Sequence, residues 1–433
     1  MERLKAISKP VYDIVTFGLT ARVLNMIKSV LLATYIGANY LMDTYVLAFS
    51  AVMLASKTLA DGITLSLIST YQQVDRRDGR KGRNELTSNS INSFSLISLV
   101  LIIIGLLLAP IIIRIMGPGF KGQSLEKTIK LFRLGLPIML LDFIRAICAG
   151  YLQSQHKFKA GAKSGVVNSL VYIFYLIIFG DKFGLEGVIL AGILAVLGQI
   201  VVMMAALVSD GYKYETYQNL QDRTLKRVIS FLFPISLGIG INELNIAIDN
   251  AVASSLAQGT IAELSYANGI INFIYGIFIV AIITAIFPVL SKNYDQEDLY
   301  EFRQNIRFVI KLLIGIIIPI SLLLIKYSNQ LVKFVYGRGE FGAREIEYTS
   351  EFLKFYAMGL IGLALVLLIV RIYYAIHDTK TPTLIAGLVL LTNLIFNIIL
   401  GRTMGGSGIA LASTISVVLA SIVGLYDLKR KIF

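Results

Sequence analysis

Among the charged residues that stand in or beside long apolar stretches in the first half of the sequence, five are candidates for substrate binding. They are Arg22, Lys28, Asp43, Lys57 and Arg145. A charge inside a membrane-spanning segment is costly, so such residues usually face a partner or a water-filled cavity. Cations that line a cavity suit an anionic group such as a diphosphate, because Arg and Lys form charge-assisted hydrogen bonds with phosphate oxygens. We therefore predict a substrate-binding site built from these five side chains.

Internal pairing is the alternative for each of these charges. Lys57 and Asp61 are four residues apart, and Asp142 and Arg145 are three apart, so each pair can meet on one face of a helix. Asp43 lies near the end of its stretch, where a role at the membrane surface is the simpler interpretation. For Arg22, Lys28 and Arg145 the sequence leaves cavity lining and pairing equally open, whereas for Lys57 it favours pairing with Asp61.

Side chains that bear oxygen atoms characterise the second half. The candidate ligands are Asp249, Asn393, Asn397 and Ser413, with Thr414 as an alternative to Ser413. Asn242 and Asn245 share the helical face of Asp249, which adds amides but no cation. Such oxygens from several helices could hold Na⁺, and the carboxylate could exchange a proton. Hydrogen bonding between helices, typically about 1 kcal/mol for each bond, is the other interpretation.

Residues for other chemistry are sparse. The single cysteine, Cys148, cannot form an internal disulfide, and the two histidines, His156 and His377, stand alone. The sequence shows no zinc-ligand spacing, phosphate-binding glycine loop or Ser/His/Asp pattern. We therefore predict no catalytic residue, no enzymatic activity and no cofactor beyond a coupling Na⁺ or H⁺.

The elements that must carry these residues are membrane-spanning helices. The chain has 433 residues, of which 56% are hydrophobic, and its mean hydropathy is +0.74. Runs such as 96–113 are apolar on all sides and do not alternate, which excludes barrel strands and favours helices of roughly 20 residues. We place twelve spans at about 11–36, 41–71, 89–116, 127–153, 162–180, 185–208, 225–255, 261–290, 304–335, 346–376, 381–400 and 405–427.

The basic residues predict the orientation of these spans. They gather in the N-terminal arm, every second loop and the tail: Arg3, Lys5, Lys9, Arg76, Arg77, Arg80, Lys81, Arg83, Lys157, Lys159, Lys163, Arg223, Lys226, Arg227, Lys429, Arg430 and Lys431. Loops rich in Lys and Arg stay in the cytoplasm, so both termini should be cytoplasmic. The net charge of +13 then reflects topology and contact with anionic lipids, not nucleic acid.

The sequence repeats itself at one spacing. Three pairs of residues are 221 positions apart: His156 and His377, Gly187 and Gly408, and Phe120 and Phe341. We predict two homologous six-helix halves, 1–216 and 217–433, although apolar helices can also look alike by chance. Parallel repeats of this kind are typical of secondary transporters, whose binding site lies at the repeat interface.

Several motifs resemble one family. The segments at 335–360 (VYGRGEFGAREIEYTSEFLKFYAMGL) and 371–383 (RIYYAIHDTKTPT) look like lipid II flippases of the MurJ/MviN type, within the multidrug/oligosaccharidyl-lipid/polysaccharide exporter superfamily. Segments 22–49, 241–256 and 287–294 also match, so the resemblance covers most of the chain. It implies two six-helix lobes around a central cavity, and outward flipping of an undecaprenyl-diphosphate-linked muropeptide by alternating access.

The resemblance also assigns roles to particular residues. Arg22 matches an essential arginine of the family, Lys28 a second cationic position, and Asp43 a conserved aspartate of the first loop region. Asp61 and Gly62 match an acidic–glycine pair. The family's sodium site implies a role for Asp249, Asn393, Asn397 and Ser413, with Thr414 one residue away.

The sequence departs from the family pattern at three places. Ser56 and Lys57 replace an arginine pair, Gly269 replaces an arginine in the eighth span, and Asn397 replaces an acidic residue. A flippase for another lipid-linked oligosaccharide is therefore an alternative to a lipid II flippase. A cation-coupled drug or metabolite antiporter would require an acidic cavity, and a non-transporting membrane scaffold is the remaining alternative.

The expected setting follows from the resemblance. We expect a multi-pass protein of the bacterial cytoplasmic membrane that takes a lipid-linked glycan as substrate and contacts membrane lipids. We expect a monomer, with cell-wall synthesis proteins as potential partners.

Overall fold

The computed structural model describes residues 2–180, 182–219 and 221–432, and the side chains of residues 2–15 and 237 lie outside the description. Within these ranges the chain forms helices joined by turns and loops, and no strand. The prediction of an all-α protein is therefore confirmed. The side chains of Arg3, Lys5 and Lys9, which contributed to the predicted orientation, fall outside the described part.

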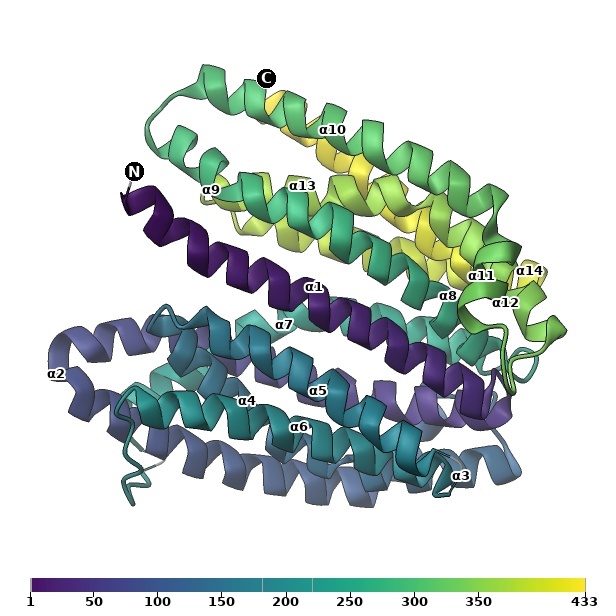
Figure 1. Cartoon of the computed structure of the whole chain (residues 1–433), viewed down its shortest axis with the longest axis horizontal. Coiled ribbons are helices and arrows are strands. Elements are labelled where there is room, and N and C mark those ends of the chain that lie inside the picture. The colour runs from purple at the N-terminus through teal and green to yellow at the C-terminus, as the bar shows by residue number, and fades with distance from the viewer. Residues whose placement is uncertain (1, 181, 220, 433) are drawn as a thin grey trace. The chain divides into compact units, whose positions relative to one another are not determined.

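The first half of the chain forms long helices, and breaks at Gly79 and Leu136 divide two of the helical stretches. In order they are α1 (Glu2–Ile36), α2 (Tyr40–Met116), α3 (Gly122–Gly135), α4 (Pro137–Ser154), α5 (Phe158–Phe179) and α6 (Gly184–Ser209), as shown in Figure 1. Within α2, Gly79 has φ 62° and ψ −149°, a conformation that residues with a side chain rarely adopt. The two arms of α2 on either side of Gly79 contain the predicted spans 41–71 and 89–116. Pro137 begins α4 and splits the predicted span 127–153.

The second half also consists of helices. Its elements are α7 (Arg223–Ala253), α8 (Thr260–Ile274), the π-helical turn η1 (Tyr275–Val280), α9 (Ala281–Asp295), α10 (Leu299–Lys326), α11 (Ser328–Tyr336), α12 (Ala343–Met358), α13 (Leu360–Ala375) and α14 (Lys380–Ile432). Helices α12 and α13 meet at a bend of 43°. Gly405, with φ 61° and ψ −138°, divides α14 into two arms that contain the last two predicted spans.

Each of the twelve predicted spans is therefore helical in the structure. Seven helices of the described chain are long and apolar enough to cross a membrane, and nine are if each of two bent pairs counts as one span. Helices α2 and α14 count once each in that number, although each contains two predicted spans. The chain is thus a multi-pass helical membrane protein.

Contacts divide the chain into two compact units. Unit 1 contains the residues up to Leu31 together with Thr44–Glu243, and unit 2 contains Leu32–Asp43 together with the residues from Leu244 onward. This division rests on packing, whereas the predicted halves 1–216 and 217–433 rest on sequence repetition. The predicted halves, and the central cavity that the family resemblance implies, stay predictions.

The spacing of 221 residues reappears in backbone geometry. His156 and His377 both have positive φ, 57° and 61°, at the ends of α4 and α13. In each turn the His N–H bonds to the carbonyl three residues earlier, and the next N–H bonds to the carbonyl five residues earlier. This is the Schellman arrangement, which satisfies the last carbonyls of a helix. Gly184 and Gly405, also 221 apart, share positive φ as well.

Each unit contains an aromatic core. In unit 1, Tyr151 contacts Tyr71 and Tyr212 edge-on, with ring centroids 5.7 Å and 6.2 Å away. In unit 2, Tyr266 packs against Tyr336 at 5.0 Å and Phe341 at 5.4 Å. Such edge-on aromatic pairs add about 0.5–1.5 kcal/mol beyond the burial of their area.

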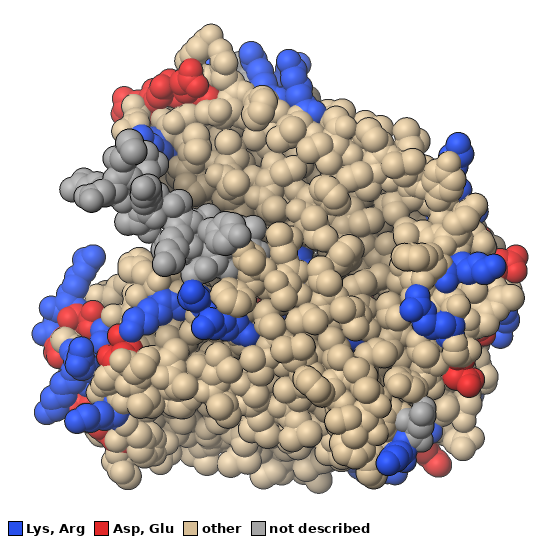
Figure 2. Space-filling view, in the orientation of Figure 1, with Lys and Arg blue, Asp and Glu red and all other residues tan. Residues whose placement is uncertain are grey.

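The outer surface differs from that of a water-soluble protein. Large apolar side chains are exposed along the helices, including Leu107 at 73% and Ile115 at 70% on α2 and Phe334 at 78% on α11. In Figure 2 the charged side chains gather toward the ends of the helices, and the surface between them is mostly uncharged. A contiguous apolar surface of this kind suits contact with lipid chains.

Candidate functional site

The first polar network lies within unit 1 and joins α2 to α7. Lys57 Nζ donates to Glu243 Oε1 at 2.5 Å. The Lys57 side chain is 47% exposed, whereas that of Glu243 is 8% exposed. The sequence pattern favoured Asp61 as the partner of Lys57, and the structure shows Glu243 instead. Glu243 was missed because it lies on a different face of its helix from Asp249, so helical spacing gave no signal for it.

The second part of this network lies around Asp142 on α4. Arg145 Nε donates to Asp142 Oδ1 at 2.8 Å, which confirms the predicted pair. The Ser56 hydroxyl donates to Asp142 Oδ2 at 2.8 Å. Asp61 also lies within electrostatic reach of Arg145 and Lys57. Ser56, which stands where the family pattern has arginine, thus acts here as a neutral donor to a buried carboxylate.

The charge balance of this network differs from the expected cationic site. Lys57 and Arg145 face three carboxylates, those of Asp61, Asp142 and Glu243. Each of the two cations therefore already has an acidic partner. An anionic ligand that used them would compete with those carboxylates.

The two cations of α1 lie in different surroundings. Lys28 Nζ is 4.4 Å from the centroid of the Tyr172 ring on α5, a cation–π contact. Arg22 is half-buried one and a half turns earlier on the same helix. The structure thus brings Lys57 and Arg145 into one network and places Lys28 against an aromatic face.

Asp43 has a structural position in unit 2. It is 4% exposed, and it accepts the backbone N–H of Gly259 at 2.5 Å and that of Ala262 at 2.8 Å. These N–H groups belong to the start of α8, where helical donors lack partners within the helix. Asp43 therefore caps α8, and both of its carboxylate oxygens are engaged by the backbone.

The four predicted cation ligands converge within unit 2. Asp249 on α7 accepts a hydrogen bond from Asn397 Nδ2 at 2.6 Å and one from the Ser413 hydroxyl at 3.2 Å. Asn393 accepts from Asn397 at 2.9 Å and donates to Ser413 at 3.2 Å. Thr414 instead donates to the Phe355 carbonyl at 2.7 Å. The structure therefore brings together Ser413, not Thr414, with the other three.

The donor set of this cluster fits a monovalent cation. Asn397 is fully buried, and its Oδ1 is an acceptor with no hydrogen-bond partner in the described structure. A buried unsatisfied acceptor is costly, and a cation or a rotation of the amide would satisfy it. The described residues hold no group of three or more acidic, His or Cys side chains of the kind that binds a divalent metal. One carboxylate with amide and hydroxyl oxygens is consistent with Na⁺, or with a proton on Asp249.

A third cluster stabilises one end of unit 1. Arg83 is 5% exposed and donates to Asp75 and to Gln155, both at 2.7 Å. Asp210 receives hydrogen bonds from Lys157 and from the Tyr151 hydroxyl. In the sequence, Arg83 and Lys157 indicate only the topology. The cluster links the break in α2 to the loops after α4 and α6.

The ionisation of Asp210 reflects these contacts. Burial alone would raise the pKa of this carboxyl, but the hydrogen bonds from Lys157 and Tyr151 and the charges of Lys157 and Arg83 outweigh it and lower the pKa. Asp210 therefore remains ionised across the physiological range.

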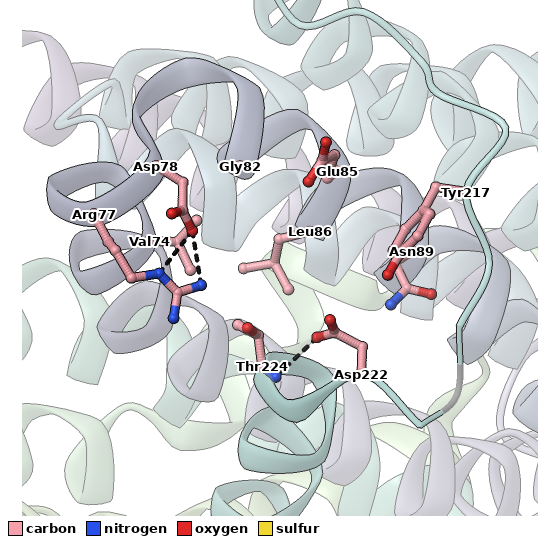
Figure 3. A pocket seen from close by; sticks show the side chains of 10 residues that line it. All are labelled: Val74, Arg77, Asp78, Gly82, Glu85, Leu86, Asn89, Tyr217, Asp222 and Thr224. Carbon is pink, nitrogen blue, oxygen red and sulfur yellow. Dashed lines mark hydrogen bonds and ion pairs between the residues drawn. The ribbon is translucent and has the colours of Figure 1, made fainter.

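A small hollow of about 70 Å³ opens beside this cluster, between the break in α2 and the start of α7 (Figure 3). Three acidic side chains (Asp78, Glu85 and Asp222) and Arg77 line it. Arg77 is bound to Asp78 at 2.7 Å, and Asp222 accepts the backbone N–H of Thr224 at 2.8 Å, as the dashed lines of Figure 3 show. Glu85 Oε1 lies 3.9 Å from Lys81 Nζ, so each of the three carboxylates already has a partner.

Long apolar helices that bury a polar network within each unit are typical of membrane transporters. A sequence model of the family described as lipid II flippase MurJ matches residues 32–433. The chain belongs to this family, as the sequence motifs predicted.

Individual relatives agree with this assignment. A probable lipid II flippase MurJ of Rickettsia prowazekii (strain Madrid E) is 26% identical over 403 residues, which cover 92% of this chain and 78% of the relative. A lipid II flippase MurJ of Burkholderia cenocepacia is 22% identical over 424 residues, or 96% and 82% of the two chains.

Solved structures show the same fold. A lipid II flippase MurJ in an inward closed conformation has a TM-score of 0.82 at 26% identity and covers 97% of this chain and 87% of its own. An inward-facing multidrug resistance MATE family transporter has a TM-score of 0.77 at 15% identity and covers 95% and 94%. The second likeness concerns the fold alone.

Proposed function

We propose that this protein moves a polyprenyl-diphosphate-linked cell-wall precursor, lipid II, from the inner to the outer leaflet of the bacterial cytoplasmic membrane. The match to the lipid II flippase family over residues 32–433 carries this proposal. The protein would act by alternating access and would transport the lipid without chemical change. We further propose that it works as a monomer and that both termini are cytoplasmic, as the distribution of Lys and Arg favours.

The unit 1 network supports a mechanism based on exchange of ion pairs. The diphosphate would displace Glu243 from Lys57, because two phosphate groups offer more acceptor oxygens than one carboxylate. Lys57 is half-exposed, so a ligand can reach it, whereas Glu243 is nearly buried. Arg22, Lys28 and Arg145 would add attraction for the same anionic group.

The unit 2 cluster supports coupling to a cation. Na⁺ held by Asp249, Asn393, Asn397 and Ser413, or a proton on Asp249, would neutralise a buried carboxylate in one conformation of the transport cycle. A ligand shifts a conformational equilibrium only by its difference in affinity for the two states. A cation that binds at Asp249 in one conformation alone would therefore favour the return of the protein to the inward-facing conformation.

A flipping assay in proteoliposomes tests the proposal. Purified full-length protein is reconstituted with lipid II or with another undecaprenyl-diphosphate-linked sugar, each with and without a Na⁺ gradient. Flipping of lipid II in preference to the other lipid supports the proposal. Flipping of the other lipid alone would replace lipid II by that oligosaccharide, and flipping of neither would contradict the flippase function.

One observation keeps the second substrate class open. Gly269 on α8 and Ser56 on α2 stand where the family pattern has arginine, and Ser56 is bound to Asp142. A lysine also lacks the bidentate fork of arginine, so Lys57 binds a diphosphate less specifically. These departures favour a test with several lipid-linked glycans.

A further inference from the structure

A second hollow lies beside the one in Figure 3 and shares Arg77 and Thr224 with it. Its volume is about 240 Å³, and its polar lining is Thr70, Gln73, Arg77, Arg223, Thr224 and Arg227. We call it the arginine hollow. Three of these six residues are arginines, and they come from two helices, α2 and α7. No carboxylate stands among its described lining residues, in contrast to the acidic hollow of Figure 3.

Without a bound anion, the positions of Arg223 and Arg227 cost electrostatic free energy. Arg223 and Arg227 are four residues apart at the start of α7, where like charges repel and cations oppose the helix dipole. Asp222 caps this helix through the N–H groups of Thr224 and Leu225. In the described part of the chain, the ion pair at this hollow joins Arg77 to Asp78 and includes neither Arg223 nor Arg227.

The geometry is suited to a phosphate group. The Arg227 guanidinium lies 5.5 Å from the centroid of the Phe231 ring, a contact that restricts its orientation. Guanidinium groups bind phosphate oxygens in pairs, and the Gln73 amide and Thr224 hydroxyl could add neutral donors. A volume of about 240 Å³ accommodates one phosphate group with its attached headgroup or water.

We propose that the arginine hollow binds a phosphate group, supplied by an anionic phospholipid headgroup or by a soluble phosphate, and thereby holds α2 to the start of α7. This binding site is additional to the transport pathway. It uses the proposed orientation only to place the hollow at the cytoplasmic membrane surface. Binding is measured without any transport, so its failure is distinct from a failure of the flippase function.

The experiment uses the absence of tryptophan from the sequence. Phe231→Trp places a single tryptophan, which can be excited selectively over tyrosine, beside Arg227 in the full-length protein. Brominated phosphatidylglycerol or brominated phosphatidylcholine serves as quencher in lipid vesicles. We expect phosphatidylglycerol to bind on the order of tenfold more tightly, because each basic residue near a membrane surface favours anionic lipid. In a second arm, inorganic pyrophosphate is added in neutral detergent, and the melting temperature is measured.

Matched variants distinguish a specific phosphate site from nonspecific attraction to positive charge. Arg223→Gln/Arg227→Gln should abolish the lipid preference or lower the pyrophosphate shift to the part that the proposed transport site supplies. Lys429→Gln/Arg430→Gln removes the same charge from the tail and should leave both unchanged. Phosphatidylglycerol preference identifies a lipid site, and a pyrophosphate shift identifies a soluble ligand. No preference and no shift, or equal loss in the control variant, would overturn the proposal.

A third variant keeps the proposal testable if the double glutamine variant does not fold. If Arg223→Gln/Arg227→Gln elutes as an aggregate, Arg223→Lys/Arg227→Lys retains both charges and removes the planar forks. We expect the lysine variant to lose most of the preference or shift. Unchanged binding by the lysine variant would also overturn the proposal, because it would show that charge alone attracts the lipid.

Discussion

The polar networks of the two units differ in composition. In unit 1, Lys57 and Arg145 stand among three carboxylates and form ion pairs. In unit 2, Asp249 stands among neutral donors and has no basic side chain in its described hydrogen-bond set. Unit 1 is therefore suited to exchanging one anion for another, and unit 2 to taking up or releasing a cation.

In the proposed mechanism, unit 1 recognises the substrate and unit 2 provides the coupling. A paired cation in unit 1 is available to a substrate only when its carboxylate partner is displaced. A lone carboxylate in unit 2 costs free energy while it is ionised and buried, so a cation or proton lowers that cost. The predictions below test the two halves of this comparison.

The largest expected effect belongs to the cations of unit 1. Arg22→Ala should lower the flipping rate at least about 30-fold if Arg22 contacts the diphosphate as proposed, because removing one partner of a desolvated charge pair costs about 2–5 kcal/mol. The measurement is lipid II flipping in proteoliposomes, with insertion verified by size-exclusion elution. Arg114→Ala, at an exposed position near the end of α2, is the matched control. If Arg22→Ala flips lipid II at the wild-type rate, Arg22 has no role in the substrate-binding site.

The cation site of unit 2 comes next. Asp249→Asn retains the shape of the side chain but removes its charge, so flipping should become independent of Na⁺ and proton gradients. We expect a rate about tenfold lower with the gradient, within the usual range of coupling free energies.

Ser413→Ala provides a graded comparison for that experiment. It removes one hydroxyl from the Asp249 cluster and should weaken the cation dependence without abolishing it. Full gradient dependence in Asp249→Asn would show that coupling, if present, lies elsewhere.

At Glu243 we expect a smaller effect, in which substitution strengthens substrate binding instead of impairing transport. Glu243→Gln removes the competitor for Lys57, so the apparent affinity for the diphosphate lipid should rise about fivefold, equivalent to about 1 kcal/mol for a half-exposed ion pair. Concentration-dependent flipping or binding measures this change. Lys57→Gln should lower the affinity, and the double variant should show that the two effects are not independent. Weaker binding by Glu243→Gln would contradict the exchange mechanism.

The smallest effect concerns stability, outside both networks. Asp210→Asn should lower the melting temperature at pH 7 by about 2–4 °C, because Arg83 and Lys157 lose an ionised partner. The folded-state pKa of Asp210 lies below its usual value. Its contribution is therefore complete above the unfolded pKa of about 3.9 and is lost as the pH falls through the folded-state pKa. The melting temperatures of wild type and variant should converge in that acidic range, and a constant difference would exclude the charge as the cause.

Much of the fold could be predicted from sequence because apolar runs of membrane length leave the backbone little choice. The predicted spans lie in helices, although breaks at Leu136, Tyr327 and Gly359 divide three of them. The break in α2 lies at Gly79, between two predicted spans, and the break in α14 lies at Gly405, where the last predicted span begins. Asp249, Asn393, Asn397 and Ser413 also meet as predicted. Helical spacing placed Asn393 and Asn397 on one face, and the family pattern related them to α7.

The site in unit 1 was less predictable. Spacing within one helix correctly paired Asp142 with Arg145, but it could not show that Lys57 on α2 would meet Glu243, which lies 186 residues later. Asp43 looked like a membrane-surface or substrate residue, and its use as a cap for α8 depends on a loop 216 residues away. Contacts of this range depend on how helices pack.

Local hydropathy and motifs within single segments were enough to predict a multi-pass helical membrane protein, its family and the spacing of 221 residues. Only the tertiary structure decided which charges are paired, which oxygens surround Asp249, and that three arginines from α2 and α7 share one hollow. The reason is physical: hydropathy acts along the chain, whereas the partner of a charge is set by the helix that packs beside it.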